Sequence, residues 1–391
     1  MNSGKVTGHR KLWTPHQVSK RFVTALEPAI SPVAGHKDRC HIIIFCGAGF
    51  AKAWSLRSPL SKDLFGVPTT AFKKSESLYR LLEYLSKGDS GYLTQDDFKE
   101  LASFLDLCAH HPFLLGNLMD QYSPRRLQVE LAHVIKEHFR EIHYINDLNA
   151  PTGHLPVKSK KSPHRKPMIQ FLSELLHDHC EFTPDHSGVE LCFVTTNYDY
   201  SVESWLQEST QEPILDTLYR GFTPTHIHGE ENSQYLMDRP YGLKLFKLNG
   251  GFEISENSAG FAIDYRSSVT NPIMILPSNY QGYGAEYFRC VLDKAAVAFR
   301  RADLVLFVGY SFPPEDVLIR RLIWLLVEDQ RPRRTKKIIC INQKGSQAVK
   351  ERLREIFGSA TLDITTSKLE FQKFCEGCNH YFSKIREGRP I

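Results

Sequence analysis

The stretch His41-Ile42-Ile43-Ile44-Phe45-Cys46-Gly47-Ala48-Gly49-Phe50 decides the fold class of this 391-residue chain. Its first six residues form a continuous apolar and β-branched run, which is typical of a strand buried in a parallel sheet. The glycines that follow place small residues where backbone amides can approach a phosphate at the start of a helix. The string lacks the third glycine of the dinucleotide fingerprint, so a tight turn without a ligand remains an equal alternative.

Three further runs of strand length occur at 191–196, 304–308 and 337–341. Helical apolar spacing separates them, for example at 291–301 and 317–327. Because strands that alternate with helices indicate an α/β fold, we predict a Rossmann-like, mostly parallel sheet flanked by helices.

The strand-like and helical patterns also predict the domain organisation. Between the first two strand-like runs the strand signal is weak, and helical spacing recurs at 75–85, 96–107, 125–142 and 168–177, with Thr94 as a predicted N-cap. We expect an N-terminal arm at 1–37 and a Rossmann-like domain in two pieces, at 38–65 and 190–345. We also expect an inserted helical subdomain at 66–189 and a C-terminal helical segment at 346–391.

Composition excludes several classes of protein. A net charge of +5 is too weak by itself to indicate nucleic-acid binding. We find no secretory leader and no apolar run of about 18 residues, so no membrane span is expected. The nine cysteines show no secreted pairing pattern, which favours a cytoplasmic protein. Cys375-Glu-Gly-Cys378 resembles half of a metal site, but no second CxxC accompanies it, and we expect no metal there.

A polar string, Thr195-Thr196-Asn197-Tyr198-Asp199, directly follows the second strand-like run. Ligands of open α/β folds bind at the carboxyl edge of the sheet, where such a cluster lies. The amide of Asn197 can hold a water or a ribose hydroxyl, because it both donates and accepts hydrogen bonds. The alternative is that Asn197 and Asp199 cap a helix at 200–207.

The string Gly309-Tyr310-Ser311-Phe312 repeats this construction of a strand and a small-residue turn, and a helix with prolines in its first turn follows it. Gly309 and Ser311 are candidates for a second phosphate or ribose contact. Asn342, which ends the last strand-like run, is a candidate for the adenosine ribose or an ordinary turn residue.

The chain contains, in order, GAGF, TTNYD, KLNG at 247–250, ILPSNY at 275–280 and GYSF followed by an acidic residue. This order resembles the sirtuin-like NAD-binding family, and more closely its divergent bacterial branch used in anti-phage defence. The resemblance implies NAD bound across the sheet edge as the substrate. The glycines of GAGF would meet the dinucleotide phosphates, Asn197 and Asp199 would face the nicotinamide ribose, and GYSF with Asn342 would hold the adenosine side. The implied cofactor-binding residues are Gly47, Ala48, Gly49, Phe50, Thr196, Asp199, Gly309, Tyr310, Ser311 and Asn342.

Two departures from the family pattern bear on the reaction. Deacylases of the family carry a four-cysteine zinc module that we do not find here, so no zinc is expected and deacylation is disfavoured. The family usually has Lys-Leu-His-Gly, with the histidine as general base, whereas this chain has Asn249. An amide cannot accept a proton at neutral pH, and general-base help contributes roughly 10²–10⁴-fold in rate. Cleavage of the glycosidic bond depends less on that base, because Asn197 can orient the water.

The alternative base is His228, in Thr225-His226-Ile227-His228-Gly229. KLNG is followed by PIMILPSNY as in the family, whereas His228 lies in a polar loop. We therefore assign the catalytic position to Asn249 and keep His228 as the alternative, with Asn197 as the other catalytic residue.

The resemblance implies an NAD+ glycohydrolase (NADase) effector of anti-phage defence that forms nicotinamide and ADP-ribose. The alternatives are a catalytically silenced NAD- or ADP-ribose-binding subunit, for which Asn249 speaks, and an unrelated α/β module whose glycine turns are structural. The chain contains no P-loop string, nucleic-acid motif or repeat array that would serve as a sensor. A separate partner subunit is thus implied: a HerA-type DNA-translocating ATPase first, an Argonaute-like protein second. We also expect homo-oligomerisation through the helical insertion.

Overall fold

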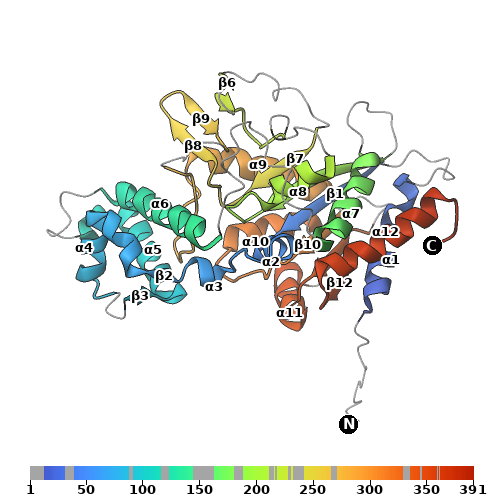
Figure 1. The fold of residues 1–391 in the computed structure, drawn as a ribbon, viewed down its shortest axis with the longest axis horizontal. Coiled ribbons are helices and arrows are strands. Elements are labelled where there is room, and N and C mark those ends of the chain that lie inside the picture. The colour runs from blue at the N-terminus through green and yellow to red at the C-terminus, as the bar shows by residue number, and fades with distance from the viewer. Residues whose placement is uncertain are drawn as a thin grey trace, which may run out of the picture.

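Six strands form one parallel sheet at the centre of the structure, a computed structural model (Figure 1). Their spatial order is β12-β11-β10-β1-β4-β7, and every neighbouring pair is parallel. The strands are β1 (Arg39–Cys46), β4 (Gly188–Thr195), β7 (Lys244–Lys247), β10 (Leu304–Val308), β11 (Lys337–Ile341) and β12 (Asp363–Ser367). The chain moves outward from β1 to β7 and then returns to the other side of β1. This is the strand order of the doubly wound Rossmann fold, and it confirms the predicted α/β class.

The structure describes residues 13–30, 39–87, 91–115, 123–143, 163–179, 188–210, 215, 218–227, 230–231, 242–265, 271–328, 335–343, 346–358, 360 and 362–391. Within these ranges, no helix is both long and apolar enough to cross a membrane.

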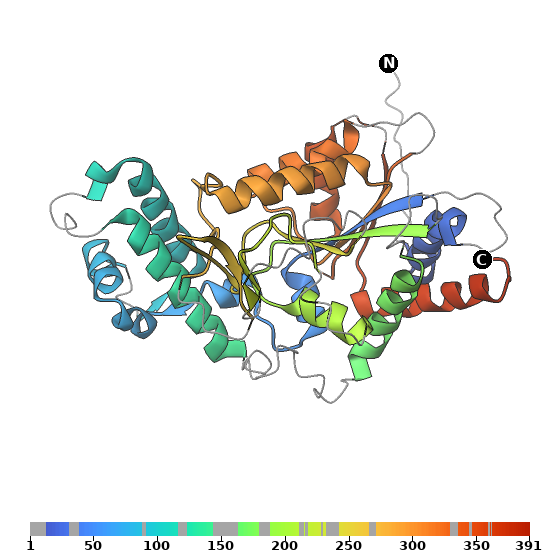
Figure 2. The same cartoon turned by 90° about the horizontal axis from the view of Figure 1, so that it is seen from above.

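Helices cover both faces of the sheet, as the view from above shows (Figure 2). On one side lie α9 (Glu286–Arg301) and α10 (Val317–Trp324), drawn in orange. On the other side lie α7 (Lys166–His177), α8 (Ser201–Thr210) and α12 (Phe371–Arg386). Since both faces are covered, the central strands are buried, and this explains why they read as unbroken apolar runs.

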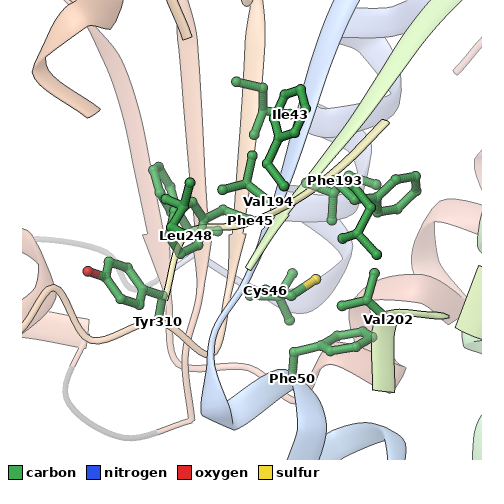
Figure 3. Close-up of a cluster of buried hydrophobic side chains, with 14 of the residues drawn as sticks. Ile43, Phe45, Cys46, Phe50, Phe193, Val194, Val202, Leu248 and Tyr310 are labelled. Atoms are coloured by element: carbon green, nitrogen blue, oxygen red, sulfur yellow. The ribbon is translucent and has the colours of Figure 1, made fainter. Parts of the chain in front are cut away.

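A cluster of buried hydrophobic side chains surrounds the neighbouring strands β1 and β4 (Figure 3). Ile44 and Phe45 of β1 and Phe193 of β4 are fully buried. Each such side chain contributes roughly 1.5–3 kcal/mol to stability through removal of apolar surface from water. Because this core lies directly below the carboxyl ends of the strands, it fixes the positions of the loops that follow them.

The inserted helices form a separate layer at one end of the molecule (Figure 1). The layer contains α4 (Glu76–Tyr84), α5 (Gln95–His110) and α6 (Pro124–His143), with the short η1 (Thr69–Lys74), η2 (Pro112–Leu115), β2 (Val67–Pro68) and β3 (Tyr92–Leu93). Thr94 begins α5 with a capping box, in which its hydroxyl accepts from the Asp97 amide at 3.2 Å and its own amide donates to the Asp97 carboxylate at 3.1 Å. The predicted N-cap is therefore confirmed.

Helix α7 differs from this layer, although the sequence pattern groups it with the insertion. It packs against α8 and α12, beside the central sheet. The indole of Trp205 in α8 donates to the carbonyl of Met168 at 2.9 Å, and both side chains are fully buried. Residues 166–177 thus belong to the layer that covers the sheet.

The N-terminal arm contains a helix, and the C-terminal segment contains a strand that the sequence does not predict. Residues 1–37, expected as an arm, include α1 (Pro15–Ile30), whose Phe22 is fully buried against Phe374 of α12. The segment 346–391, expected to be helical, contains the strand β12 between α11 (Ser346–Phe357) and α12. This strand, Asp-Ile-Thr-Thr-Ser, lies at the edge of the sheet, so its apolar pattern is too weak to read.

A second, smaller sheet of four strands has the order β6-β5-β9-β8. Its strands are β5 (His226–Ile227), β6 (Glu230–Glu231), β8 (Ile254–Asn257) and β9 (Gly260–Ile263). The string that contains His226 therefore includes a strand, whereas the sequence suggests a polar loop. His228 itself lies outside the described residues.

Candidate functional site

The strand order of the main sheet reverses between β1 and β10, and the loops after these strands touch each other there. Gly47 donates its amide to the Val308 carbonyl at 2.9 Å, and Gly49 donates to the Gly309 carbonyl at 3.0 Å. A Cβ atom on Gly47 would lie 2.6 Å from the Gly309 oxygen, and one on Gly49 would lie 2.7 Å from the Gly309 Cα. Gly309 has a φ of +63°, which favours glycine. Backbone packing alone thus accounts for these three glycines.

A cavity of about 480 Å³ lies beside this contact. Eight of the predicted site residues line it, namely Ala48, Thr196, Asn197, Asp199, Asn249, Gly309, Tyr310 and Ser311. The lining also includes Phe65, Gln95 and Phe139, and the last two come from the helical insertion. Ligands of doubly wound folds bind where the strand order reverses, and the volume is typical of a small-molecule site.

Four predicted residues do not line the cavity: Gly47, Gly49, Phe50 and Asn342. Phe50 points into the core, where its ring centroid lies 5.1 Å from that of Trp205 (Figure 3). Asn342 donates its side-chain amide to the Tyr310 carbonyl at 3.3 Å. These residues support the walls of the cavity, and a direct cofactor contact by Phe50 is not compatible with its buried position.

The side chains of Asn197 and Asp199 have different roles. Asn197 donates its side-chain amide to the Gly47 carbonyl at 3.0 Å and is 9% exposed, so it joins the TTNYD string to the GAGF string. Asp199 accepts the amide of Ser201 at 2.9 Å and also the Ser201 hydroxyl, at the start of α8. Asp199 therefore contacts the first residue of α8, as the helix-capping alternative expects, while the Asn197 side chain bonds across to the GAGF string.

Asn249 is held in the cavity wall by its backbone and its side chain. Its carbonyl accepts the amide of Ile275 at 2.9 Å, and its side-chain oxygen accepts the hydroxyl of Tyr283 at 3.3 Å. The side chain is 8% exposed. KLNG and ILPSNY are thus adjacent in space, and Asn249 is an element of the site.

A group of four buried charges lies behind TTNYD and KLNG. Lys247, fully buried, places its ammonium group 3.1 Å from Glu203 and 3.0 Å from Glu253. Arg220 pairs with the same two carboxylates. Burial alone would raise the pKa of Glu253, but the Lys247 and Arg220 charges outweigh it and lower that pKa. The four formal charges cancel. Sequence reasoning missed this group, although Lys247 and Glu253 flank Asn249 in KLNGGFE.

A carboxyl group that is not among the predicted site residues also lies in the cavity wall. Asp316 is 7% exposed and accepts the hydroxyl of Tyr310 at 2.6 Å. Burial raises the pKa of Asp316 to about 6. The sequence signal, Pro-Pro-Glu-Asp after GYSF, reads as a helix start and hides this environment.

One cation, Arg352 of α11, lines the cavity among the residues that the structure describes. Its guanidinium donates to the Ser311 carbonyl at 2.6 Å. A guanidinium at this position can receive an anionic group such as a diphosphate.

In the described part of the chain, no group of three or more His, Cys, Asp and Glu side chains is arranged to hold a metal ion. Cys375 and Cys378 both lie on α12 and are fully buried. Burial raises the pKa of both thiols, which favours the inert protonated form. They are core residues.

Comparison with known proteins finds one family model and several solved structures that are similar to this chain. A family model described as the SIR2-like domain matches residues 191–362, which is less than half of the chain and includes TTNYD, KLNG and GYSF. No curated protein is matched. Among solved structures, the chain is similar to Sir2Tm bound to a propionylated peptide, with 13% identity, a TM-score of 0.37, and 94% of this chain and 98% of that chain covered. It is also similar to a Sir2 homologue mutant in complex with ADP-ribose, with 12% identity, a TM-score of 0.36, and 94% and 96% covered.

Proposed function

We propose that this protein binds NAD in the cavity at the strand-order reversal and hydrolyses it to nicotinamide and ADP-ribose. The observation that carries the proposal is that Asn197 and Asn249 line one cavity with the loops of GAGF and GYSF. The match of residues 191–362 to the SIR2-like domain supports the same substrate.

The reaction breaks the bond between C1′ of the ribose and the pyridinium nitrogen. The bonding electron pair goes to that nitrogen, so nicotinamide leaves as a neutral molecule. Water forms the new bond to C1′ and loses one proton. The side-chain amide of Asn197 orients this water, since the bond from its nitrogen to the Gly47 carbonyl holds the amide plane in place.

We assign the rest of the bound dinucleotide to the remaining residues around the cavity. Arg352 and the loop of Gly309 to Ser311 receive the diphosphate. Phe65 and Phe139 of the insertion side exclude water from the bound nucleotide, which strengthens the polar contacts inside. We assign the hydrogen bonds to the ribose hydroxyls to Thr196 and Asn249.

The biological setting follows from the family resemblance. We propose an anti-phage effector of a bacterial cytoplasm that acts as a homo-oligomer, held inactive until a partner subunit senses invasion. A HerA-type DNA-translocating ATPase is the first partner to test and an Argonaute-like protein the second.

A second function is favoured by one observation, the amide of Asn249 where the family usually has a general base. In that case the chain is a catalytically silenced subunit that binds NAD or ADP-ribose.

A time course of NAD with the purified full chain separates the two functions, with products resolved by chromatography and Asn197→Ala and Asn249→His beside it. Release of nicotinamide and ADP-ribose that stops in Asn197→Ala supports hydrolysis. The silenced subunit is supported if calorimetry shows that the wild type binds NAD without turnover, and if turnover appears only in Asn249→His. No binding at millimolar NAD would contradict both.

A further inference from the structure

We propose that the carboxylate of Asp316 is the proton acceptor for the water that attacks NAD, in place of the histidine that position 249 lacks. This inference rests on the proposed hydrolysis. It assigns the base to a residue of the turn between β10 and α10, which the motif comparison does not connect with the reaction.

The other two carboxylates of the cavity wall are more exposed than Asp316 and have partners of their own. Asp199 caps α8 through Ser201. Glu315 is 28% exposed at its side chain and lies 3.7 Å from the ammonium group of Lys99. Asp316 is the most buried of the three and has no ion pair within the described ranges. It is therefore the carboxylate that is best placed to take up a proton.

A line of polar side chains joins Asp316 to Asn249. The hydroxyl of Tyr283 lies 3.3 Å from the Asn249 side-chain oxygen and 3.2 Å from that of Gln281. Gln281 is also close enough to the Asp316 carboxyl group to lower its pKa. Asn249, Gln281 and Asp316 all line the cavity. The line does not carry protons, because an amide is a poor relay, but it places the carboxylate and Asn249 on one wall around the bound ribose.

The surroundings of Asp316 suit a base that operates near neutral pH. Burial is the main cause that raises its pKa to about 6, and the negative charge of Glu315 adds to the rise. The Tyr310 hydroxyl, Gln281 and the charge of Lys99 oppose it. A base with a pKa close to the working pH is both ionised and able to accept a proton.

In the proposed step, water attacks C1′ as the C1′–N bond breaks and its electron pair moves to nicotinamide. The water proton passes to Asp316, which then releases it to solvent. The products are nicotinamide, ADP-ribose and one proton, so the reaction needs no other reactant.

The test is the pH dependence of NAD hydrolysis by the full chain from pH 5 to 9, with kcat and KM measured for each variant. The wild type should lose activity below about pH 6. Asp316→Asn should lower kcat by roughly 10²–10⁴-fold, with KM little changed and the acidic limb absent. Asp178→Asn, an acidic residue of a surface ion pair with Arg386, is the matched control and should keep the wild-type profile.

Tyr310→Phe gives a second readout that does not depend on the folding of Asp316→Asn. Loss of the hydroxyl removes a bond to the ionised carboxylate, so the acidic limb should move to higher pH by roughly one pH unit. An active wild type whose acidic limb persists in Asp316→Asn and stays in place in Tyr310→Phe would overturn the role of Asp316 alone. Absence of hydrolysis in the wild type at every pH would overturn both this role and the proposed function.

Discussion

The ammonium group of Lys247 lies 3.0 Å from the carboxylate of Glu253, and both side chains are fully buried. The same ammonium group donates to the backbone carbonyls of Tyr198 and Asp199 at 3.1 Å and 2.7 Å. A single buried cation thus connects the KLNG string to the TTNYD string and to a carboxylate six residues along the chain. The relative positions of Asn197 and Asn249 depend on this pair.

We expect Lys247→Met to destabilise the protein by about 3–5 kcal/mol, because the buried carboxylates of Glu203 and Glu253 then have one counter-charge too few. Denaturant unfolding measures this. In the double variant Lys247→Met with Glu253→Gln, Arg220 and Glu203 still form a balanced pair at 3.8 Å, so the loss should be smaller than in the single variant. A double variant as unstable as the sum of the two single variants would show that the pair is not coupled.

Gly309→Ala should destabilise the protein and abolish NAD binding. Gly309 has a φ of +63°, and an added Cβ would overlap the backbone of Gly49 and Phe50. Gly358→Ala is the control, since Gly358 has a φ of +58° with nothing within 4 Å of an added Cβ. The control should cost only about 1 kcal/mol, the strain of positive φ. Equal losses in thermal unfolding would show that the loop contact at Gly309 is unimportant.

The buried carboxyl of Asp316 should make the ligand-free protein less stable as pH rises. Its pKa is raised from 3.8 to about 6, so the folded state binds more protons than the unfolded state between these values. Stability is lost as pH rises through this window, and the deficit of roughly 3 kcal/mol is complete above it. We expect Asp316→Asn to be more stable than the wild type at pH 7.5 but not at pH 4, by chemical denaturation at both values. The same difference at both pH values would contradict a buried titrating carboxyl.

Variants of Phe50 distinguish a role of this side chain in the hydrophobic core from a role in cofactor binding. Phe50→Ala should cost about 3–5 kcal/mol of stability, because the side chain is fully buried against Trp205. Phe50→Leu keeps an apolar side chain there and should fold, with NAD affinity by calorimetry unchanged. A tenfold loss of affinity in a fully folded Phe50→Leu would restore the cofactor contact that the motif predicts.

The local sequence was sufficient to predict the elements whose surroundings are the same on every side. The runs that form β1, β4, β10 and β11 are buried on both faces, so apolar and β-branched residues continue without alternation. The edge strand β12 has a strand neighbour on only one side, and its sequence lacks that signal. Thr94 was readable because a capping box is made within four residues.

By itself, the sequence determined the α/β class and placed the polar strings at the carboxyl ends of the strands, because both follow from short-range periodicity. Only the tertiary structure decided which of those side chains reach the cavity. Phe50 turns into the core and Asp316 into the cavity wall, although each follows a glycine turn after a strand. The difference arises from contacts between segments far apart in the chain, such as Tyr283 with Asn249, and no local pattern records such contacts.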